Sequence, residues 1–275
     1  MRYGVVIPRP NSFSAMYNDC FLEQAVAVVY GLRGLGHLAE LRSNCFSDEI
    51  SIIFGANTLP PGSRLPHDSI VYNLEQPDTG CIEATRKHVV ANPGVKVWEY
   101  KRSSLPFWER WGIPVTHVPV GYVQEMTYIP NQKDKDIDLF FSGVMNPRRS
   151  HIIDQQRMRG LKVVVVDKIF GPERDALISR SKIVLNIHFY EGKWFEICRV
   201  AQAISNHKAV LSEVSCDWEE YKWLEQGIAL TEYDRFVYEI KDLLANPAKL
   251  EVLEEKGFDI FSKVDEKEIL KEALC

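Results

Sequence analysis

The sequence predicts an α/β protein made of two Rossmann-like halves and a C-terminal helical tail, and three observations lead to this fold class. Short, near-continuous apolar segments alternate with segments of helical periodicity, which is typical of parallel strands covered by helices on both faces. The alternation stops once, over residues 121–135, and then starts again. The chain has 275 residues, of which 45% are hydrophobic and 26% charged, and this length and composition suit two small globular domains.

The first half, residues 1–122, begins with an apolar segment at 3–7 that predicts a strand. A helix is expected at 21–35, because small and aliphatic side chains follow one stripe and Gly36 then ends the pattern. Four further apolar segments predict strands. They lie at 51–54, 69–72, 95–98 and 115–118.

A linker over residues 123–135 leads to the second half, residues 136–245, and a helical tail over 246–275 follows. The linker is polar and contains a proline, and no apolar period runs through it. The second half repeats the alternation, with strands at 137–141, 162–166, 183–187 and 209–211 and helices at 147–159, 172–180 and 195–205. In parallel sheets ligands bind beyond the carboxyl ends of the strands, so the loops at those ends are the candidate sites.

The charge balance excludes a global basic field for nucleic acid, because 33 basic and 38 acidic side chains leave a net charge of −5. One local basic cluster consists of Arg148, Arg149, Arg157, Arg159 and Lys162. Anionic lipid and nucleic acid are open as partners of this cluster. A solvated helix face, with one or two arginines serving a phosphate, is the interpretation we favour.

The sequence indicates a cytoplasmic location, reduced cysteines and no bound metal. No apolar stretch approaches ~18 residues and the N-terminal apolar run is too short for the core of a signal peptide, so we expect a cytoplasmic protein without an integral membrane segment. The six cysteines are scattered and are expected to be reduced thiols. Asp134, Asp136 and Asp138 precede an apolar strand, at the wrong end for a ligand site, so no metal is expected.

Polar and basic residues follow the strand at 137–141 and form the first candidate loop. Serine and glycine allow close backbone approach, and Pro147 suits the first position of a helix whose N–H groups bind anions. Together these features suit a phosphate, and an ordinary strand-to-helix turn with solvated arginines is the alternative. The candidate ligand-binding residues of this loop are Ser142, Gly143, Asn146, Arg148 and Arg149.

The second candidate loop follows the strand at 183–187 and enters a helix. Glu196 and Arg199 are three residues apart and share one helix face. There a carboxylate can accept sugar hydroxyls and an arginine can bind a phosphate with two hydrogen bonds, whereas a surface ion pair is the alternative. We expect His188 to contact a pyrophosphate or a sugar hydroxyl, and a structural histidine is the alternative.

These segments resemble the donor half of GT-B glycosyltransferases, of the family 1/4-like and spore-maturation types. The resemblance rests on residues 186–203 and 205–213, where Arg199 to Gln202 resembles an Arg-x-x-Glu motif. In the N-terminal half, residues 71–76, 97–100 and 117–122 also fit, and the resemblance covers residues 1 to about 245. Gln202 stands where many retaining members have a second glutamate, and the donor's hydroxyls are therefore assigned to Glu196.

The resemblance implies a metal-independent hexosyl- or pentosyltransferase that moves a sugar from a nucleotide-activated donor to an acceptor hydroxyl. The C-terminal half would bind the donor and the N-terminal half the acceptor. No cofactor is implied, because the nucleotide-sugar is a substrate. A glycan, a lipid-linked sugar, a protein and a modified nucleobase are open as acceptors. A catalytically silent binding subunit and a sugar-nucleotide epimerase are the two alternative functions.

The resemblance also assigns roles. Glu75 follows the strand at 69–72 as a general base or sugar ligand, with a solvated carboxylate or helix cap as the alternative. The aromatic residues at 98–100 and 107–111 suit an acceptor wall or core. The catalytic candidates are Glu75, His188 and Arg199; the donor-binding candidates are the first loop with Glu191, Lys193 and Glu196; and the acceptor-binding candidates are Asn11, Ser12 and Tyr122.

Overall fold

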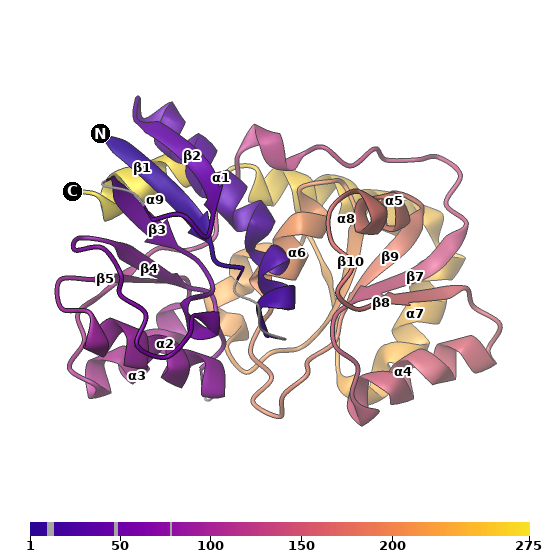
Figure 1. The fold of residues 1–275 in the computed structure, drawn as a ribbon. Helices are drawn as coiled ribbons and strands as arrows, with labels where there is room; N and C mark the ends of the chain where they lie inside the picture. Colours follow the sequence, from indigo (N-terminus) through magenta and orange to yellow (C-terminus); the bar gives the residue numbers. More distant parts are fainter. Residues whose placement is uncertain (10–13, 47–48, 78) are drawn as a thin grey trace. The chain divides into compact units, whose positions relative to one another are not determined.

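The computed structural model divides the chain into two compact units, each built around one parallel β-sheet (Figure 1). The first unit contains residues 1–125 and 265–275, and the second contains residues 126–264. The predicted fold class, two Rossmann-like domains with C-terminal helices, is confirmed. The structure describes residues 1–9, 14–46, 49–77 and 79–275.

The sheet of the first unit has six parallel strands in the order β2-β1-β3-β4-β5-β6. The strands are β1 (Arg2–Ile7), β2 (Leu38–Ser43), β3 (Ile50–Ile53), β4 (Ile70–Asn73), β5 (Lys96–Glu99) and β6 (Val115–His117). The sequence does not predict β2, because Glu40 and Arg42 interrupt its apolar pattern. β2 is an edge strand that pairs with β1 alone, and an edge strand tolerates exposed charged side chains.

Helices cover both faces of this sheet (Figure 1). They are α1 (Leu22–Gly34), α2 (Gly80–Ala91), α3 (Leu105–Arg110) and α9 (Glu266–Ala273), with short 3-10 helices η1 (Ser14–Phe21), η2 (Ala56–Thr58), η3 (Arg102–Ser104) and η4 (Gln124–Met126). Ile82 and Val89 of α2 and Trp108 of α3 belong to one core cluster with the strands. Trp98 and Trp108 are at most 2% exposed, so these rings belong to the core and not to an acceptor wall.

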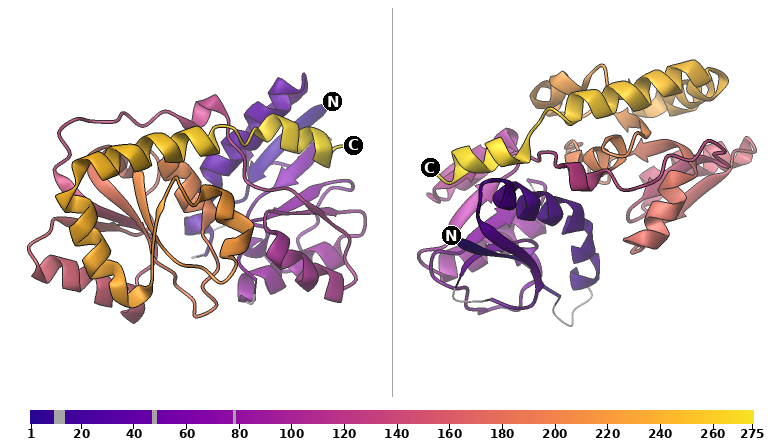
Figure 2. Two further views of the ribbon diagram at one scale, coloured as in Figure 1. Left: turned by 180° about the vertical axis from the view of Figure 1, so that it is seen from behind. Right: turned by 90° about the horizontal axis from the view of Figure 1, so that it is seen from above.

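The last helix, α9, packs against α1 in the first unit (Figure 2). A side chain on Gly31 of α1 would come within 2.8 Å of Leu270 Cδ1, so this close approach requires glycine. Glu266 accepts a 2.9 Å hydrogen bond from the N–H of Gly121 through Oε2. Glu266 is only 1% exposed, and burial raises the pKa of its carboxyl group to about 8.

We expect Glu266→Gln to stabilise the protein near pH 8 and to have a smaller effect near pH 5. The pKa of Glu266 is higher in the folded than in the unfolded protein. At pH values between the unfolded pKa and about 8, folding is therefore accompanied by proton uptake at Glu266. The contribution of Glu266 to stability consequently falls as pH rises through this window. Glutamine keeps an acceptor for Gly121 without a buried charge. Melting temperatures of both proteins at pH 5 and pH 8 measure this; an equal difference at the two pH values contradicts it.

The sheet of the second unit has five parallel strands in the order β11-β10-β9-β7-β8. The strands are β7 (Ile137–Ser142), β8 (Val163–Val166), β9 (Ser181–Asn186), β10 (Ala209–Glu213) and β11 (Ala229–Thr231). The helices are α4 (Pro147–Met158), α5 (Pro172–Ser179), α6 (Ile197–Ile204), α7 (Phe236–Ala245) and α8 (Pro247–Phe261), with 3-10 helices η5 (Trp218–Leu224) and η6 (Tyr233–Arg235). The sequence predicts all of these strands except β11, a three-residue edge strand.

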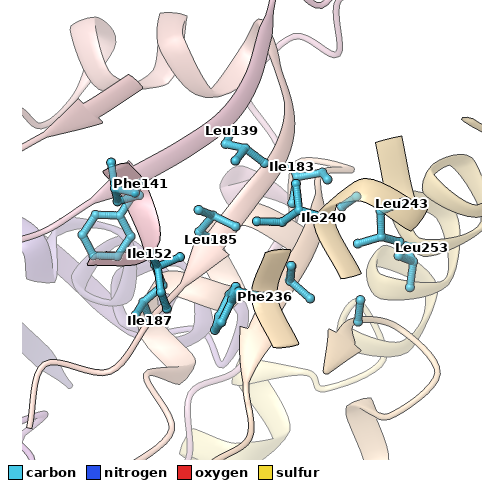
Figure 3. Close-up of a cluster of buried hydrophobic side chains, with 14 residues drawn as sticks. Leu139, Phe141, Ile152, Ile183, Leu185, Ile187, Phe236, Ile240, Leu243 and Leu253 are labelled. Atoms are coloured by element: carbon cyan, nitrogen blue, oxygen red, sulfur yellow. The ribbon is translucent and has the colours of Figure 1, made fainter. Parts of the chain in front are cut away.

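One face of this sheet buries the cluster of hydrophobic side chains drawn in Figure 3. Alternate residues of the strands, such as Leu139 and Phe141 of β7, meet Ile152 of α4 and Phe236 of α7. α5 and α6 contact the central strands β7, β9 and β10 and cover the other face. Since helices cover both faces, the central strands read as continuous apolar segments in the sequence.

The segment predicted as a linker packs, from residue 126 onward, on the second unit. The N–H of Ile129 donates to Asn206 Oδ1 at 2.7 Å, and Thr127 Oγ1 donates to the carbonyl of Ser205 at 2.8 Å. Lys208 is fully buried and donates to Asn131 Oδ1 at 2.8 Å, and burial lowers its pKa to about 8. The predicted tail is also divided, because α8 belongs to the second unit and only α9 belongs to the first.

Two further expectations concern cysteines and membranes. Within the described residues, no disulfide joins any of the six cysteines. A search of the same residues finds no helix with the length and apolar character that a bilayer crossing requires.

Candidate functional site

The carboxyl ends of β7, β9 and β10 lie side by side in the second unit and carry its polar residues. Asn186, the last residue of β9, pairs in register with Ser212 of β10 and donates to its hydroxyl at 2.9 Å. Asn146 caps α4 by accepting from the N–H of Arg149, and Pro147 takes the first helical position as predicted. This edge is where a parallel sheet binds its ligand.

Arg149 is the most buried cation at this edge, with 3% of the residue exposed. Its Nε donates to the carbonyl of Ile187 at 2.9 Å and its Nη1 to the carbonyl of Val144 at 2.8 Å. The guanidinium also lies over the Phe141 ring, 4.9 Å from its centroid. Burial lowers the pKa of Arg149 to about 10, and the neighbouring arginine charges act in the same direction.

Glu196 joins Arg149 to Arg199. Its Oε1 accepts from Arg149 Nη2 at 2.9 Å, and its Oε2 pairs with Arg199 Nη1. Arg199 is held further by the Ser142 carbonyl, 3.1 Å from Nε, and by Asn186 Oδ1, 2.6 Å from Nη1. In the part of the chain that the structure describes, no hydrogen bond engages Arg199 Nη2. The Glu196–Arg199 pair is therefore part of a partly buried cluster and not an isolated surface ion pair.

Gly143 lies directly against the two guanidinium groups. A Cβ atom at this position would be 3.1 Å from Arg199 Nη2 and 3.3 Å from Arg149 Nη1. Its φ of +150° is also one that other residues rarely adopt. The N–H of Gly143 donates to the carbonyl of Val166 at 2.9 Å. This N–H is therefore engaged within the sheet and is not directed at a ligand.

Arg148 forms a second ion pair, with Glu213 at the end of β10. Nη1 donates to Glu213 Oε2 at 2.7 Å, and Nη2 pairs with Oε1. The Tyr233 ring stacks on this guanidinium at 4.1 Å, and its hydroxyl donates to the Arg148 carbonyl at 2.8 Å. Lys193 Nζ lies 3.9 Å from Glu213 Oε1. Glu213 thus holds two cations of the cluster.

His188 lies buried among these charges, with 1% of the residue exposed. Its Nε2 is 3.1 Å from the Ser215 hydroxyl, and among the described residues its Nδ1 has no hydrogen-bond partner. Burial lowers the pKa of the imidazole, and the charges of Glu196, Glu213, Arg148 and Arg199 all act on it. The ring is therefore neutral near pH 7.

Three other predicted donor-site residues have different surroundings. Asn146 uses both ends of its side chain, since Nδ2 donates to the Phe189 carbonyl at 2.8 Å, and it is a capping residue. Ser142 contributes its carbonyl to Arg199. Glu191 is exposed in the loop before α6. Gln202, the departure from the resembled motif, donates through Nε2 to Asp175 Oδ1 at 3.4 Å.

The first unit carries its own polar residues at the ends of β4 and β5. Glu75 accepts hydrogen bonds from Asn57 and Cys81, and burial raises the pKa of its carboxyl group. Glu99 is fully buried and accepts from Asn73 and Trp108, each at 2.8 Å, and burial raises its pKa to about 8.

The predicted acceptor-binding residues are only partly placed. Asn11 and Ser12 lie outside the described residues. The backbone of Tyr122 forms a bridge with Asp265, and its carbonyl accepts from the N–H of Glu266 at 3.1 Å. Tyr122 therefore joins the end of the first unit's main segment to the start of α9.

Solved structures share this two-sheet architecture over the whole chain. AviGT4, a glycosyltransferase of avilamycin A biosynthesis, has a TM-score of 0.60 at 17% identity, covering 100% of this chain and 96% of its own. HepE of Anabaena in complex with UDP has a TM-score of 0.57 at 10% identity, covering 100% and 99%. The DNA modifying enzyme beta-glucosyltransferase has a TM-score of 0.61 at 10% identity, also covering 100% and 99%.

The chain has the GT-B fold. No model of a known protein family matches the sequence. Two uncharacterized proteins of Acanthamoeba polyphaga mimivirus are similar to it, one 24% identical over 190 residues and the other 28% identical over 188. The matched region is 66% of this chain in both cases, but only 25% of the first relative and 65% of the second.

Asp136, just before β7, and Asp138, its second residue, form ion pairs at the amino end of the sheet of this GT-B chain. Asp136 accepts from Arg180 Nη2 at 2.6 Å and pairs with Lys162, and these hydrogen bonds lower its pKa. Asp138 accepts from Lys182 Nζ at 2.7 Å. Over the described residues, no group of three or more histidine, cysteine or acidic side chains is placed to hold a metal ion.

The predicted basic cluster does not form one surface. Lys162 pairs with Asp136, and Arg157 lies 3.4 Å from Asp154 on the exposed side of α4. Arg148 and Arg149 instead turn to Glu213 and Glu196. Arg157 is therefore paired at the exposed side of α4, whereas Arg148 and Arg149 of the same helix join the cluster at the sheet edge.

The sequence analysis does not identify three polar residues near the strand ends of the two GT-B sheets: Glu213, Tyr233 and Glu99. Glu213 and Glu99 each end a short apolar strand, so the rule on strand ends that selects the other candidates points to them as well. Tyr233 carries no such signal, because it follows an edge strand that the sequence does not predict.

Proposed function

We propose that this chain is a glycosyltransferase that binds a nucleotide-activated sugar at the carboxyl edge of its second sheet and transfers the sugar to an acceptor hydroxyl. The observation that carries the proposal is the arginine cluster: Arg148, Arg149, Arg199 and Lys193 against the carboxylates of Glu196 and Glu213. Four cations against two carboxylates leave an excess of positive charge. Such a site favours an anionic ligand.

The cluster suits the chemistry of a nucleoside diphosphate leaving group. Negative charge develops on the leaving phosphate as the bond to the sugar breaks, and cations fixed in advance stabilise that charge. Arg149 and Arg199 are fixed by carbonyls at the strand ends, so little reorganisation is needed. The complexes of HepE with UDP and UDP-glucose, in the same fold, support a nucleotide-sugar as the ligand class.

The remaining roles follow the chemistry of each side chain. His188 is neutral, and its Nδ1 is available for a hydrogen bond to the ligand. Glu191 and Lys193 are assigned to the sugar end of the donor. Glu75 is assigned as the general base; burial raises the pKa of its carboxyl group, which makes its carboxylate a stronger base than an exposed one. A glycan, a lipid-linked sugar, a protein and a modified nucleobase remain the candidate acceptor classes.

A thermal-shift screen of the whole chain against nucleotide-sugars and nucleoside diphosphates tests the proposal. A ligand at 100 times its Kd stabilises by about 2.7 kcal/mol, which the melting temperature reports. Donors that shift the melting temperature are then incubated with acceptor panels, and the transferred sugar is followed by mass spectrometry. Stabilisation without turnover favours a binding subunit, and conversion of the donor alone favours an epimerase.

We expect chelators to leave turnover unchanged. The arginine cluster already supplies the positive charge that a divalent cation would supply to a leaving diphosphate. The test compares transfer rates with EDTA and with added manganese. Loss of activity in EDTA that manganese restores contradicts a metal-independent mechanism.

A further inference from the structure

Glu196 occupies the position in which an anion would bind Arg149 and Arg199 together. Each of its carboxylate oxygens pairs with a different guanidinium group, Oε1 with Arg149 and Oε2 with Arg199. Carboxylates and phosphates bind arginine in the same way, through oxygens that accept from the forked N–H groups. The chain thus supplies its own anion to this arginine pair.

Acceptors other than Glu196 fix both arginines at the sheet edge. Carbonyls of Ile187 and Val144 hold Arg149, while the Ser142 carbonyl and Asn186 hold Arg199. All these acceptors belong to strand ends or to the loops that directly follow them. The Glu196 side chain is 16% exposed, close to the 17% of Arg199 and above the 3% of Arg149. Glu196 directly precedes α6.

We propose that Glu196 is an internal counter-anion, which the diphosphate of a nucleotide ligand displaces from Arg149 and Arg199 and which returns as the nucleoside diphosphate product leaves. This inference rests on the proposed function and adds a role in product release. It differs from the assignment of Glu196 to the hydroxyls of the donor.

The exchange has a physical reason. An arginine as buried as Arg149 is costly without a counter-charge, and the lowered pKa of its side chain reflects that cost. Glu196 offsets it while no ligand is bound, and a phosphate offsets it in the complex. Because the two anions compete, the carboxylate weakens the binding of the diphosphate and so accelerates its release.

Calorimetric titration of Glu196→Gln with inorganic pyrophosphate and with UDP tests the exchange. Glutamine keeps the size of the side chain and removes the competing charge, so both ligands are expected to bind roughly tenfold more tightly, with slower dissociation of UDP. The matched control is Asp234→Asn, which removes an exposed negative charge from the same unit; among the described residues, the ion pairs of Arg148, Arg149 and Arg199 do not involve Asp234. Its affinities should stay within about twofold of wild type.

The outcomes separate this inference from the proposed function. If pyrophosphate and UDP bind more weakly to Glu196→Gln than to wild type, the exchange is wrong. Glu196 then positions the arginines or binds donor hydroxyls, and the proposed phosphate site is unaffected. Absence of pyrophosphate and UDP binding to both proteins removes the proposed function and the exchange together. If Glu196→Gln does not fold, the structure of the wild-type complex decides, because a carboxylate that still contacts both arginines beside bound pyrophosphate rules the exchange out.

Discussion

Replacing Arg149 with methionine is expected to lower the melting temperature by roughly 5–15 °C, which corresponds to about 2–5 kcal/mol of lost stability. Methionine fills much of the space of the arginine stem but cannot donate to the carbonyls of Ile187 and Val144. Those acceptors then stay buried without their donor, and Glu196 loses its pair with Arg149 while its pair with Arg199 remains. The melting temperature of Arg149→Lys should lie between those of wild type and Arg149→Met, because lysine keeps the positive charge but not the forked geometry of the guanidinium group.

Arg157→Met is the matched control for this effect. Arg157 lies on the same helix as Arg149, but half of its side chain is exposed and its ion pair with Asp154 is a surface pair. Such a substitution usually changes stability by less than about 0.5 kcal/mol. Thermal unfolding followed by circular dichroism measures both variants. Equal and small effects at the two positions would show that the contacts of Arg149 do not stabilise the second unit.

The sequence predicts the central strands of both sheets well, for a reason that also explains where it fails. β7 and β9 are covered on both faces, so most of their side chains contribute to a core and the segments read as nearly continuous apolar runs. β2 and β11 are edge strands with one neighbour each. Their stability comes from pairing with that neighbour, and this leaves no local pattern of the kind that marks a buried strand.

The site could be predicted as a set of positions but not as a set of contacts. Arg149, Glu196 and Arg199 are recognisable because each follows a predicted strand. The sequence does not show that these residues pair, because Arg149 and Glu196 are 47 residues apart and meet only when β7 and β9 pair. The Glu213–Arg148 pair spans 65 residues in the same way. The α6 helix also begins at Ile197 and not at 195, which places Glu196 before the helix.

Replacing Arg199 with alanine is expected to weaken the binding of UDP and inorganic pyrophosphate by about 10–150-fold, or roughly 1.5–3 kcal/mol. Arg199 Nη2 is the donor that the contacts within the described residues leave available, and it lies against Gly143, where the backbone permits close approach. A charge-assisted hydrogen bond to a phosphate oxygen would be lost with it. Arg199→Lys should recover only part of the affinity, because an ammonium group cannot reproduce the planar fork.

Arg180→Ala separates this contact from the general effect of removing a positive charge. Arg180 pairs with Asp136 at the amino end of the same sheet, away from the strand ends that carry the cluster. A long-range effect of net charge would lower affinity in both variants, whereas a direct contact lowers it only in Arg199→Ala. Calorimetric titration of both proteins decides between these cases. An affinity of Arg199→Ala within about twofold of wild type would mean that the guanidinium serves only Glu196, Asn186 and the Ser142 carbonyl, and Arg199 would then leave the proposed phosphate site.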